Sequence, residues 1–146
     1  MRGPANILLV EDNPSDVYLT EVALQEASIT SNLHVVEDGD KAMAFLRREG
    51  AFGAAPRPDL ILLDLNLPGK DGRQLLSELK SDESLRRIPV IVLTTSTADS
   101  DVTTCYDLHC NCYITKPVDF DHFERVVREI ERFWLRFVTL PPGIAN

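Results

Sequence analysis

The sequence predicts an α/β fold built on a parallel β-sheet. Short apolar segments alternate with longer segments of helical periodicity, a pattern typical of repeated β-α-β units. The 146 residues suit one compact domain. A content of 44% hydrophobic and 26% charged residues is that of an ordinary globular protein and excludes a disordered one.

Five segments have the composition of buried strands. They are rich in Val, Ile and Leu and are bounded by turn residues. The expected strands run from Asn6 to Val10, from Leu33 to Glu37, from Asp59 to Leu63, from Val90 to Thr94 and from Cys112 to Thr115.

Helical patterns separate these strands. The first helix opens with Asn13 as N-cap and Pro14 at its first position, and its expected inward stripe is Leu19, Ala23, Leu24 and Ala27. The last helix opens at Asp119 and places apolar residues at core spacing. Those residues are Phe123, Val127, Ile130 and Trp134. Three further helices are expected between the first and the last, from Gly39 to about Arg48, from the Pro68–Gly72 turn to Lys80, and from Asp99 to Leu108.

Charge and hydropathy exclude two kinds of partner. The formal net charge of -8 argues against nucleic-acid binding, which requires clustered Lys and Arg. The apolar segments are shorter than the roughly 20 residues of a membrane helix, and the amino-terminal segment has no apolar signal region. We therefore expect a cytoplasmic protein, with one domain over residues 1–136, a short tail over 137–146 and no output domain.

Polar residues stand at the carboxyl ends of four predicted strands. Glu11 and Asp12 follow the first, Asp64 follows the third, Thr94 ends the fourth and Lys116 follows the fifth. Because the carboxyl ends of parallel strands form the ligand crevice of an open sheet, we expect these residues to be neighbours.

Such a cluster favours phosphoryl chemistry. Three crowded carboxylates, Glu11, Asp12 and Asp64, need a cation to offset their repulsion, and Mg²⁺ prefers oxygen ligands. A carboxylate can also attack a phosphoryl group, so Asp64 is the predicted phosphoacceptor. Lys116 would then neutralise the phosphoryl oxygens, and the Thr94 hydroxyl would donate a hydrogen bond to one of them.

Four sequence segments make the chain similar to a response-regulator receiver domain over about residues 5–136. The resemblance implies a flavodoxin-like (βα)5 fold, a doubly wound sheet of five parallel strands in the order 2-1-3-4-5. It also implies that Asp64 accepts a phosphoryl group from a histidine kinase. The segments are Leu9–Asn13, Leu62–Gly72, Pro89–Thr94 and Tyr113–Pro117.

The same resemblance assigns further roles. It implies that the backbone carbonyl of Asn66 joins Glu11, Asp12 and Asp64 around Mg²⁺. It implies that the rotamer of Tyr113 follows Thr94 when the site is phosphorylated, so that Tyr113 acts as a switch. His109, at a turn position that is often glycine in the family, is expected to be a tolerated left-handed residue.

Some segments resemble a narrower group, the stand-alone regulators that partner bacterial, including cyanobacterial, phytochrome kinases. This implies a phytochrome signalling pathway and a signal that leaves through protein contacts. It also implies no enzymatic activity beyond self-phosphorylation and self-dephosphorylation. The segments are Asn13–Asp16, Glu37–Gly39, Asn111–Pro117 and Phe133–Pro142.

Other functions compete with this one. A pseudo-receiver would act as a scaffold without phosphorylation, but it would have lost part of the acid, Thr and Lys set. A haloacid-dehalogenase-type phosphatase expects a second Asp where this chain has Asn66. A flavodoxin-like flavin binder needs a hydroxyl-rich phosphate loop, and Glu11 and Asp12 would repel that phosphate.

Two further features complete the prediction. Cys105, Cys110 and Cys112 are too few and too unevenly spaced for a disulfide framework or a zinc site, which favours small buried thiols. The last helix and the tail also carry apolar residues beyond those that the core needs. A surplus of this kind predicts a homodimer interface, unless Leu135 to Pro142 folds back over it. The interface residues are Val126, Phe133 and Phe137.

Overall fold

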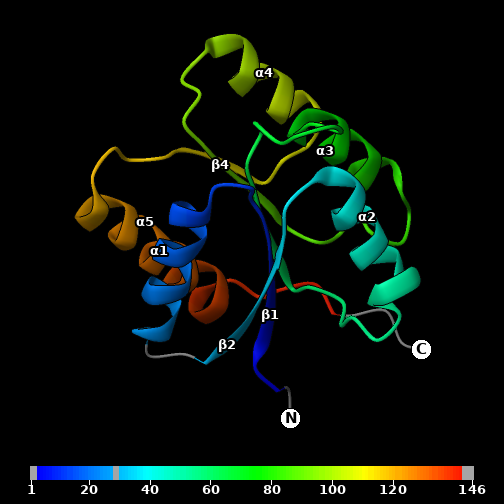
Figure 1. Cartoon of the computed structure of the whole chain (residues 1–146), viewed down its shortest axis with the longest axis horizontal. Coiled ribbons are helices and arrows are strands. Elements are labelled where there is room, and N and C mark those ends of the chain that lie inside the picture. Colours follow the sequence, from blue (N-terminus) through cyan, green and yellow to red (C-terminus); the bar gives the residue numbers. More distant parts are fainter. Residues whose placement is uncertain (1–2, 28–29, 143–146) are drawn as a thin grey trace.

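A computed structural model of the chain describes residues 3–27 and 30–142. Its five parallel strands have the order β2-β1-β3-β4-β5. Helices α1 and α5 cover one face of the sheet, and α2, α3 and α4 cover the other (Figure 1). The predicted fold class and strand order are therefore confirmed. The strands are β1 (Ala5–Val10), β2 (Ser31–Val36), β3 (Leu60–Leu63), β4 (Val90–Thr94) and β5 (Cys112–Thr115).

The helices follow the strands in strict alternation. Each α-helix except α4 begins at a side-chain N-cap, which satisfies backbone N–H groups that no helical carbonyl can reach. The helices are α1 (Pro14–Gln25), α2 (Gly39–Arg47), α3 (Gly72–Ser81), α4 (Asp99–Asp107) and α5 (Phe120–Arg132), with a 3-10 turn at Gly50–Phe52 and a π-helical turn at Phe133–Phe137.

Strand β3 shows why the central strands are apolar throughout. Ile61 and Leu63 belong to the core under α2 and α3, whereas Leu60 and Leu62 belong to the core under α1 and α5. Successive side chains of a strand point to opposite faces. Because helices cover both faces, every residue of β3 is buried.

Element boundaries differ from the predictions by one or two residues. Strand β2 begins at Ser31 rather than Leu33 and ends at Val36, because its parallel register with β1 extends from Ala5 opposite Ser31 to Val10 opposite Val36. Strand β3 begins after Asp59, whose Oδ2 accepts a hydrogen bond from the Asn6 backbone N–H at 2.9 Å.

Two predicted helical residues lie outside their helices. Helix α1 ends at Gln25, so Ala27 is not part of its inward stripe, and Thr20 is buried with Ala23 and Leu24 instead. Trp134 lies in the π-helical turn after α5, where it is half-buried against the core.

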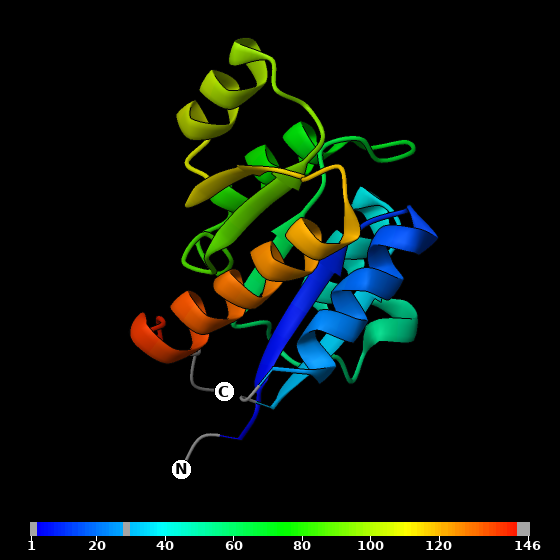
Figure 2. The same ribbon diagram turned by 90° about the vertical axis from the view of Figure 1, so that its left-hand side faces the viewer.

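The end of α5 leaves an apolar surface uncovered. The helix returns from the carboxyl ends of the strands toward their amino ends (Figure 2). Leu135 packs against the core, but Phe133 and Phe137 stay 53% and 68% exposed. The tail instead reaches a cavity of about 340 Å³, lined in part by Pro4 and Pro141. The fold-back alternative therefore does not cover the two phenylalanines.

The turn after α4 explains His109. Its φ is 69°, a left-handed conformation, and its N–H donates to the Tyr106 carbonyl at 2.9 Å. The expected left-handed residue is confirmed. Cys105 and Cys110 are buried beside this turn, and Cys112 is half-buried.

Among the residues that the structure describes, no helix has the length and apolar character to cross a bilayer.

Candidate functional site

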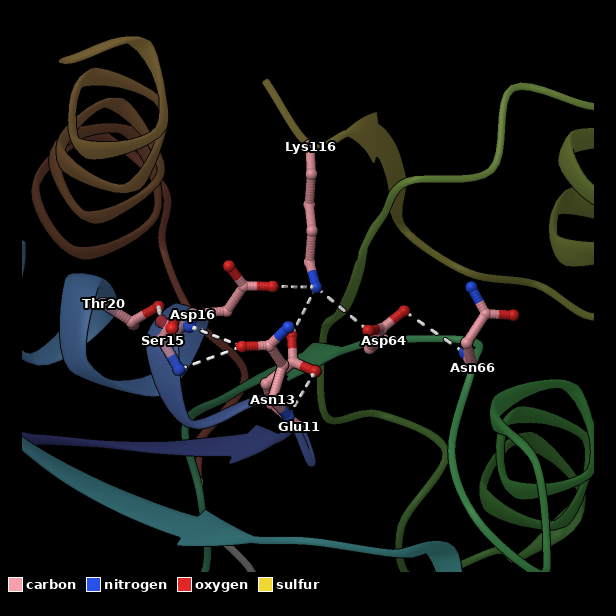
Figure 3. Close-up of polar contacts among 8 residues, drawn as sticks. All are labelled: Glu11, Asn13, Ser15, Asp16, Thr20, Asp64, Asn66 and Lys116. Carbon is pink, nitrogen blue, oxygen red and sulfur yellow. Dashed lines mark hydrogen bonds and ion pairs between the residues drawn. The ribbon is translucent and has the colours of Figure 1, made fainter. Parts of the chain in front are cut away.

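The predicted site residues gather at one edge of the sheet. Glu11 follows β1, Asp64 follows β3, and Lys116 follows β5. Parallel pairing brings these strand ends together although they are far apart in the sequence. Figure 3 shows the side chains of Glu11, Asp64 and Lys116 pointing toward one another. The predicted convergence is confirmed for these three residues.

Lys116 is the centre of the cluster. Its Nζ lies 2.5 Å from Glu11 Oε1, 2.8 Å from Asp16 Oδ2 and 3.0 Å from Asp64 Oδ2. An ammonium has three N–H donors, so these carboxylates use all of them. The side chain of Lys116 is only 5% exposed. Bonds between buried ionised groups are stronger than neutral ones, and together they fix the position of the ammonium.

The two buried carboxylates differ in protonation. Burial disfavours the charge of Asp64, but the hydrogen bond and charge of Lys116 outweigh it and lower the pKa of Asp64 below its usual 3.8. For Glu11, burial outweighs the Lys116 hydrogen bond and raises the pKa to about 7. Burial alone would lower the pKa of Lys116, but its bonds with Asp16 and Glu11 raise it. Asp64 is therefore ionised at neutral pH, as a nucleophile requires.

Glu11, Asp12 and Asp64 also form an acid group suited to a cation. Each contributes a carboxylate oxygen, and these atoms all lie within 4.8 Å of one another. Asp12 is exposed while Glu11 and Asp64 are buried, so the group opens to solvent on one side. An all-oxygen donor set fits Mg²⁺ or Mn²⁺. Within residues 3–27 and 30–142 no other such group of His, Cys, Asp or Glu ligands occurs.

The loop after β3 holds Asp64 in place. The Asn66 backbone N–H donates to Asp64 Oδ1 at 3.2 Å, and the Gly72 N–H donates to the Leu65 carbonyl at 3.0 Å. A Cβ on Gly72 would stand 2.5 Å from the Asp64 carbonyl oxygen. Only glycine therefore lets the start of α3 approach the end of β3 so closely.

Thr94 and Tyr113 lie beside this centre. Thr94 ends β4, is fully buried, and its Oγ1 has no hydrogen-bond partner among the described residues. Such a hydroxyl is an available donor, and leaving it unpaired has a cost. The Tyr113 hydroxyl donates to the Ser96 carbonyl at 2.9 Å, in the loop that follows Thr94. The two residues are therefore linked through this loop.

Asp16 is a site residue that the sequence analysis did not predict. In the sequence analysis it is named only as the end of the segment Asn13–Asp16, and an acid in the first turn of a helix is favourable whatever its function. Its contact with Lys116 joins residues 100 positions apart. A third acid within five residues of Glu11 was the available signal.

The predicted dimer residues lie far from this centre, on α5 and the turn after it. Val126 is half-buried against the core, whereas Phe133 and Phe137 are exposed. Phe133 and Phe137 therefore lie in the turn that ends α5, and Val126 lies midway along the helix.

A five-stranded parallel sheet in this order, with acids, a threonine and a lysine at its carboxyl edge, defines the receiver domains of response regulators. The chain belongs to this family: residues 7–128 match the response regulator receiver domain. It is 50% identical over 138 residues to the response regulator Rcp1 of a Synechocystis strain, covering 94% of each chain.

Solved structures agree with this assignment. The chain is similar to the phosphorylated cyanobacterial phytochrome response regulator RcpA, with a TM-score of 0.93 and 51% identity over 96% of this chain and 100% of that one. It is also similar to the Mn²⁺-bound form of Rcp1, with a TM-score of 0.91 and 50% identity over 95% of this chain and 100% of the other.

Proposed function

We propose that this receiver domain is a phosphorylation-dependent switch that accepts a phosphoryl group on Asp64 from a histidine kinase. The observation that carries the proposal is the pairing of Asp64, whose pKa is lowered, with Lys116 Nζ at 3.0 Å. The unpartnered hydroxyl of Thr94 supplies a donor for a phosphoryl oxygen.

In the transfer step, an oxygen of Asp64 bonds to phosphorus while the phosphorus–nitrogen bond of a phosphohistidine breaks. The departing imidazole keeps the electron pair of that bond. Lys116 and Thr94 stabilise the phosphoryl oxygens by charge and hydrogen bonding. In dephosphorylation, water attacks phosphorus and the bond between phosphorus and the Asp64 oxygen breaks, which regenerates the carboxylate and releases inorganic phosphate. No separate substrate is turned over.

The acid group supports a requirement for Mg²⁺. Glu11, Asp12 and Asp64 would hold the ion, with the backbone carbonyl of Asn66 as a fourth protein ligand. A bound divalent cation supplies positive charge that offsets the phosphoryl oxygens. The relative Rcp1 has a Mn²⁺-bound form, which supports a divalent cation as a ligand of this chain.

An apolar surface beside the site supports kinase docking. Tyr18, Val118 and Phe120 are large hydrophobic residues that remain exposed. They lie on α1 and around the start of α5, next to the first turn of α1, which carries Asp16, and the loop that carries Lys116. Exposed apolar patches usually mark interaction sites. A cavity of about 490 Å³ opens there, lined by Pro14, Ser15, Tyr18, Leu19 and Phe120.

The relatives suggest which class of histidine kinase donates the phosphoryl group to Asp64. RcpA is described as a cyanobacterial phytochrome response regulator, and we extend that role to this chain. The donor would be a phytochrome histidine kinase in the cytoplasm. Phosphorylation would draw Thr94 toward the phosphoryl group and release Tyr113 from the Ser96 carbonyl, and the altered surface would carry the signal to a partner protein.

We also propose a homodimer through Val126, Phe133 and Phe137. The two exposed phenylalanine rings support it, because covering them would bury apolar area now in water. Light scattering at micromolar concentration tests this proposal. A dimer that Phe133→Glu combined with Phe137→Glu converts to monomer supports it, and a wild-type monomer, phosphorylated or not, rejects it.

Intact mass after incubation with Mg²⁺ and a small acyl phosphate tests the main proposal. The switch gains one phosphoryl group, whereas a pseudo-receiver scaffold gains none. Hydrolysis of general phosphate esters would instead indicate a phosphatase. Lack of any mass gain by the folded protein would overturn the proposal.

A further inference from the structure

Lys116 has three carboxylate partners, and they are not equivalent. Glu11 and Asp64 belong to the acid group whose oxygens lie within 4.8 Å of one another, and Asp16 does not. Asp64 is also the proposed phosphoacceptor. Two of the three contacts that fix Lys116 are therefore with groups that must change partners during the proposed reaction.

Asp16 is held by a different part of the fold. Its backbone N–H donates to Asn13 Oδ1 at 3.2 Å, and its carbonyl accepts from the Thr20 hydroxyl at 2.8 Å (Figure 3). Thr20 is itself 1% exposed. The first turn of α1 therefore fixes the backbone from which the Asp16 side chain reaches Lys116.

Charge explains why this third contact matters. A phosphorylated Asp64 carries about two negative charges and three phosphoryl oxygens in place of one carboxylate charge. Lys116 has three donors, and a phosphoryl oxygen would take one of them. Asp16 Oδ2, at 2.8 Å from Nζ, can keep its bond throughout. It then holds the flexible lysine side chain, whose ordering costs rotamer entropy.

We propose that Asp16 is a positioning residue that keeps the Lys116 ammonium beside Asp64 while Glu11 and Asp64 exchange their partners. This inference rests on the proposed function of Asp64 as phosphoacceptor. It predicts that loss of Asp16 slows phosphoryl acceptance and shortens the life of the phosphorylated state, since both depend on where Lys116 stands.

The test compares four proteins: wild type, Asp16→Ala, Asp16→Asn and Glu21→Ala. Glu21 is an exposed acid of α1 and the matched control. We expect Asp16→Ala to be labelled by a small acyl phosphate at least about tenfold more slowly, because misplaced groups lose their contribution to the step. Asp16→Asn, whose amide oxygen can accept the same bond, should recover most of the rate. Glu21→Ala should match wild type.

A second readout needs neither metal nor donor. The Lys116 ammonium of ¹⁵N-lysine-labelled wild type should give an NMR signal protected from hydrogen exchange. Asp16→Ala should weaken that protection, and Asp16→Asn should retain it. Asp16→Ser, whose side chain is too short to reach Lys116, replaces Asp16→Ala if the latter does not fold.

The outcomes separate the two proposals. Wild type that takes no phosphoryl group overturns the function of Asp64, while the exchange measurement still tests Asp16. Labelling and exchange of folded Asp16→Ala at wild-type rates would overturn the positioning role. Equal losses in Asp16→Asn and Asp16→Ala would overturn it too, because charge alone would then account for the effect.

Discussion

At the carboxyl ends of the strands, Glu11 is 2% exposed and accepts a hydrogen bond from Lys116 Nζ at 2.5 Å. At the other end of the sheet, in the last turn of α5, Glu131 is 4% exposed, and its Oε1 has no donor among the described residues. Both glutamates have a raised pKa because burial disfavours their charge. Burial of an acid is therefore common to both ends, but of these two glutamates Glu11 is the one that accepts a hydrogen bond from a buried cation.

The remaining acids sharpen this contrast. Asp64, which follows β3, pairs with the Lys116 cation, and the Thr94 hydroxyl at the end of the neighbouring strand has no hydrogen-bond partner among the described residues. Asp59, which precedes β3, accepts a hydrogen bond from the Asn6 backbone N–H. Asp59 serves the structure of the sheet edge, and Asp64 is available for chemistry. Two aspartates at the two ends of β3 therefore have different roles.

The largest expected effect is the loss of phosphoryl labelling in Asp64→Asn, with Asp59→Asn as the matched control. Asp64→Asn should abolish labelling by an acyl phosphate, because the amide has nearly the same shape but is not a nucleophile. Asp59→Asn should be labelled like wild type. Intact mass measures both. Labelling of folded Asp64→Asn at the wild-type rate would show that the phosphoacceptor lies elsewhere.

Tight backbone packing should also be confined to the site end. A Cβ at residue 72 meets Asp64 and Leu65 backbone atoms at 2.5 and 2.6 Å, so Gly72→Ala should lower the free energy of unfolding by about 3 kcal/mol. Gly53→Ala should be near neutral, since its closest contact is 3.6 Å. Urea denaturation measures the difference, and equal stability of the two variants would contradict this reading of the turn.

Mg²⁺ should stabilise the fold through the acid group, and a substitution at the amino ends of the strands should not change this stabilisation. Mg²⁺ at 100 times its dissociation constant should stabilise wild type by about 2.7 kcal/mol. Asp12→Ala should reduce this gain, and Asp59→Asn should keep it. At one fixed Mg²⁺ concentration the gain should be smaller at about pH 6 than at about pH 8, because Glu11, with a pKa of about 7, must release its proton before binding. Thermal melting with and without Mg²⁺ provides the data, and an unchanged gain in Asp12→Ala would remove Asp12 from the site.

The smallest expected effect is a change in stability on replacing Glu131, the buried acid whose Oε1 has no hydrogen-bond donor among the described residues. Glu131→Leu should raise the free energy of unfolding at neutral pH by about 1 kcal/mol, because it removes an unsatisfied buried acceptor. The folded pKa of Glu131 lies above its usual 4.5, so the folded state binds the proton more tightly. Its stabilising contribution is present at low pH and is lost as pH rises through the folded pKa. The gain from Glu131→Leu should therefore grow with pH.

Glu129→Leu, at an exposed position of the same helix, is the control for that measurement and should show no comparable gain. A loss of stability in Glu131→Leu across the pH range would mean that the carboxylate has a partner that stabilises the fold.

Local pattern was enough to determine the alternation of strands and helices, the apolar character of β3 and β4, and the placement of Glu11, Asp64, Thr94 and Lys116 at strand ends. These features depend on neighbours in the chain, such as the Asn13 cap before α1. The parallel sheet then follows from the fold class, and with it the meeting of the strand ends.

Only the tertiary structure decided which charges touch. The contact between Asp16 and Lys116 depends on the angle at which α1 packs beside the end of β5, and no local pattern specifies that angle. The missing partner of Glu131 Oε1 and the exposure of Phe133 likewise depend on how α5 and the turn after it pack. Sequence spacing defines the face of an element, but contacts between elements distant in the chain are set by how their side chains fill the space between them.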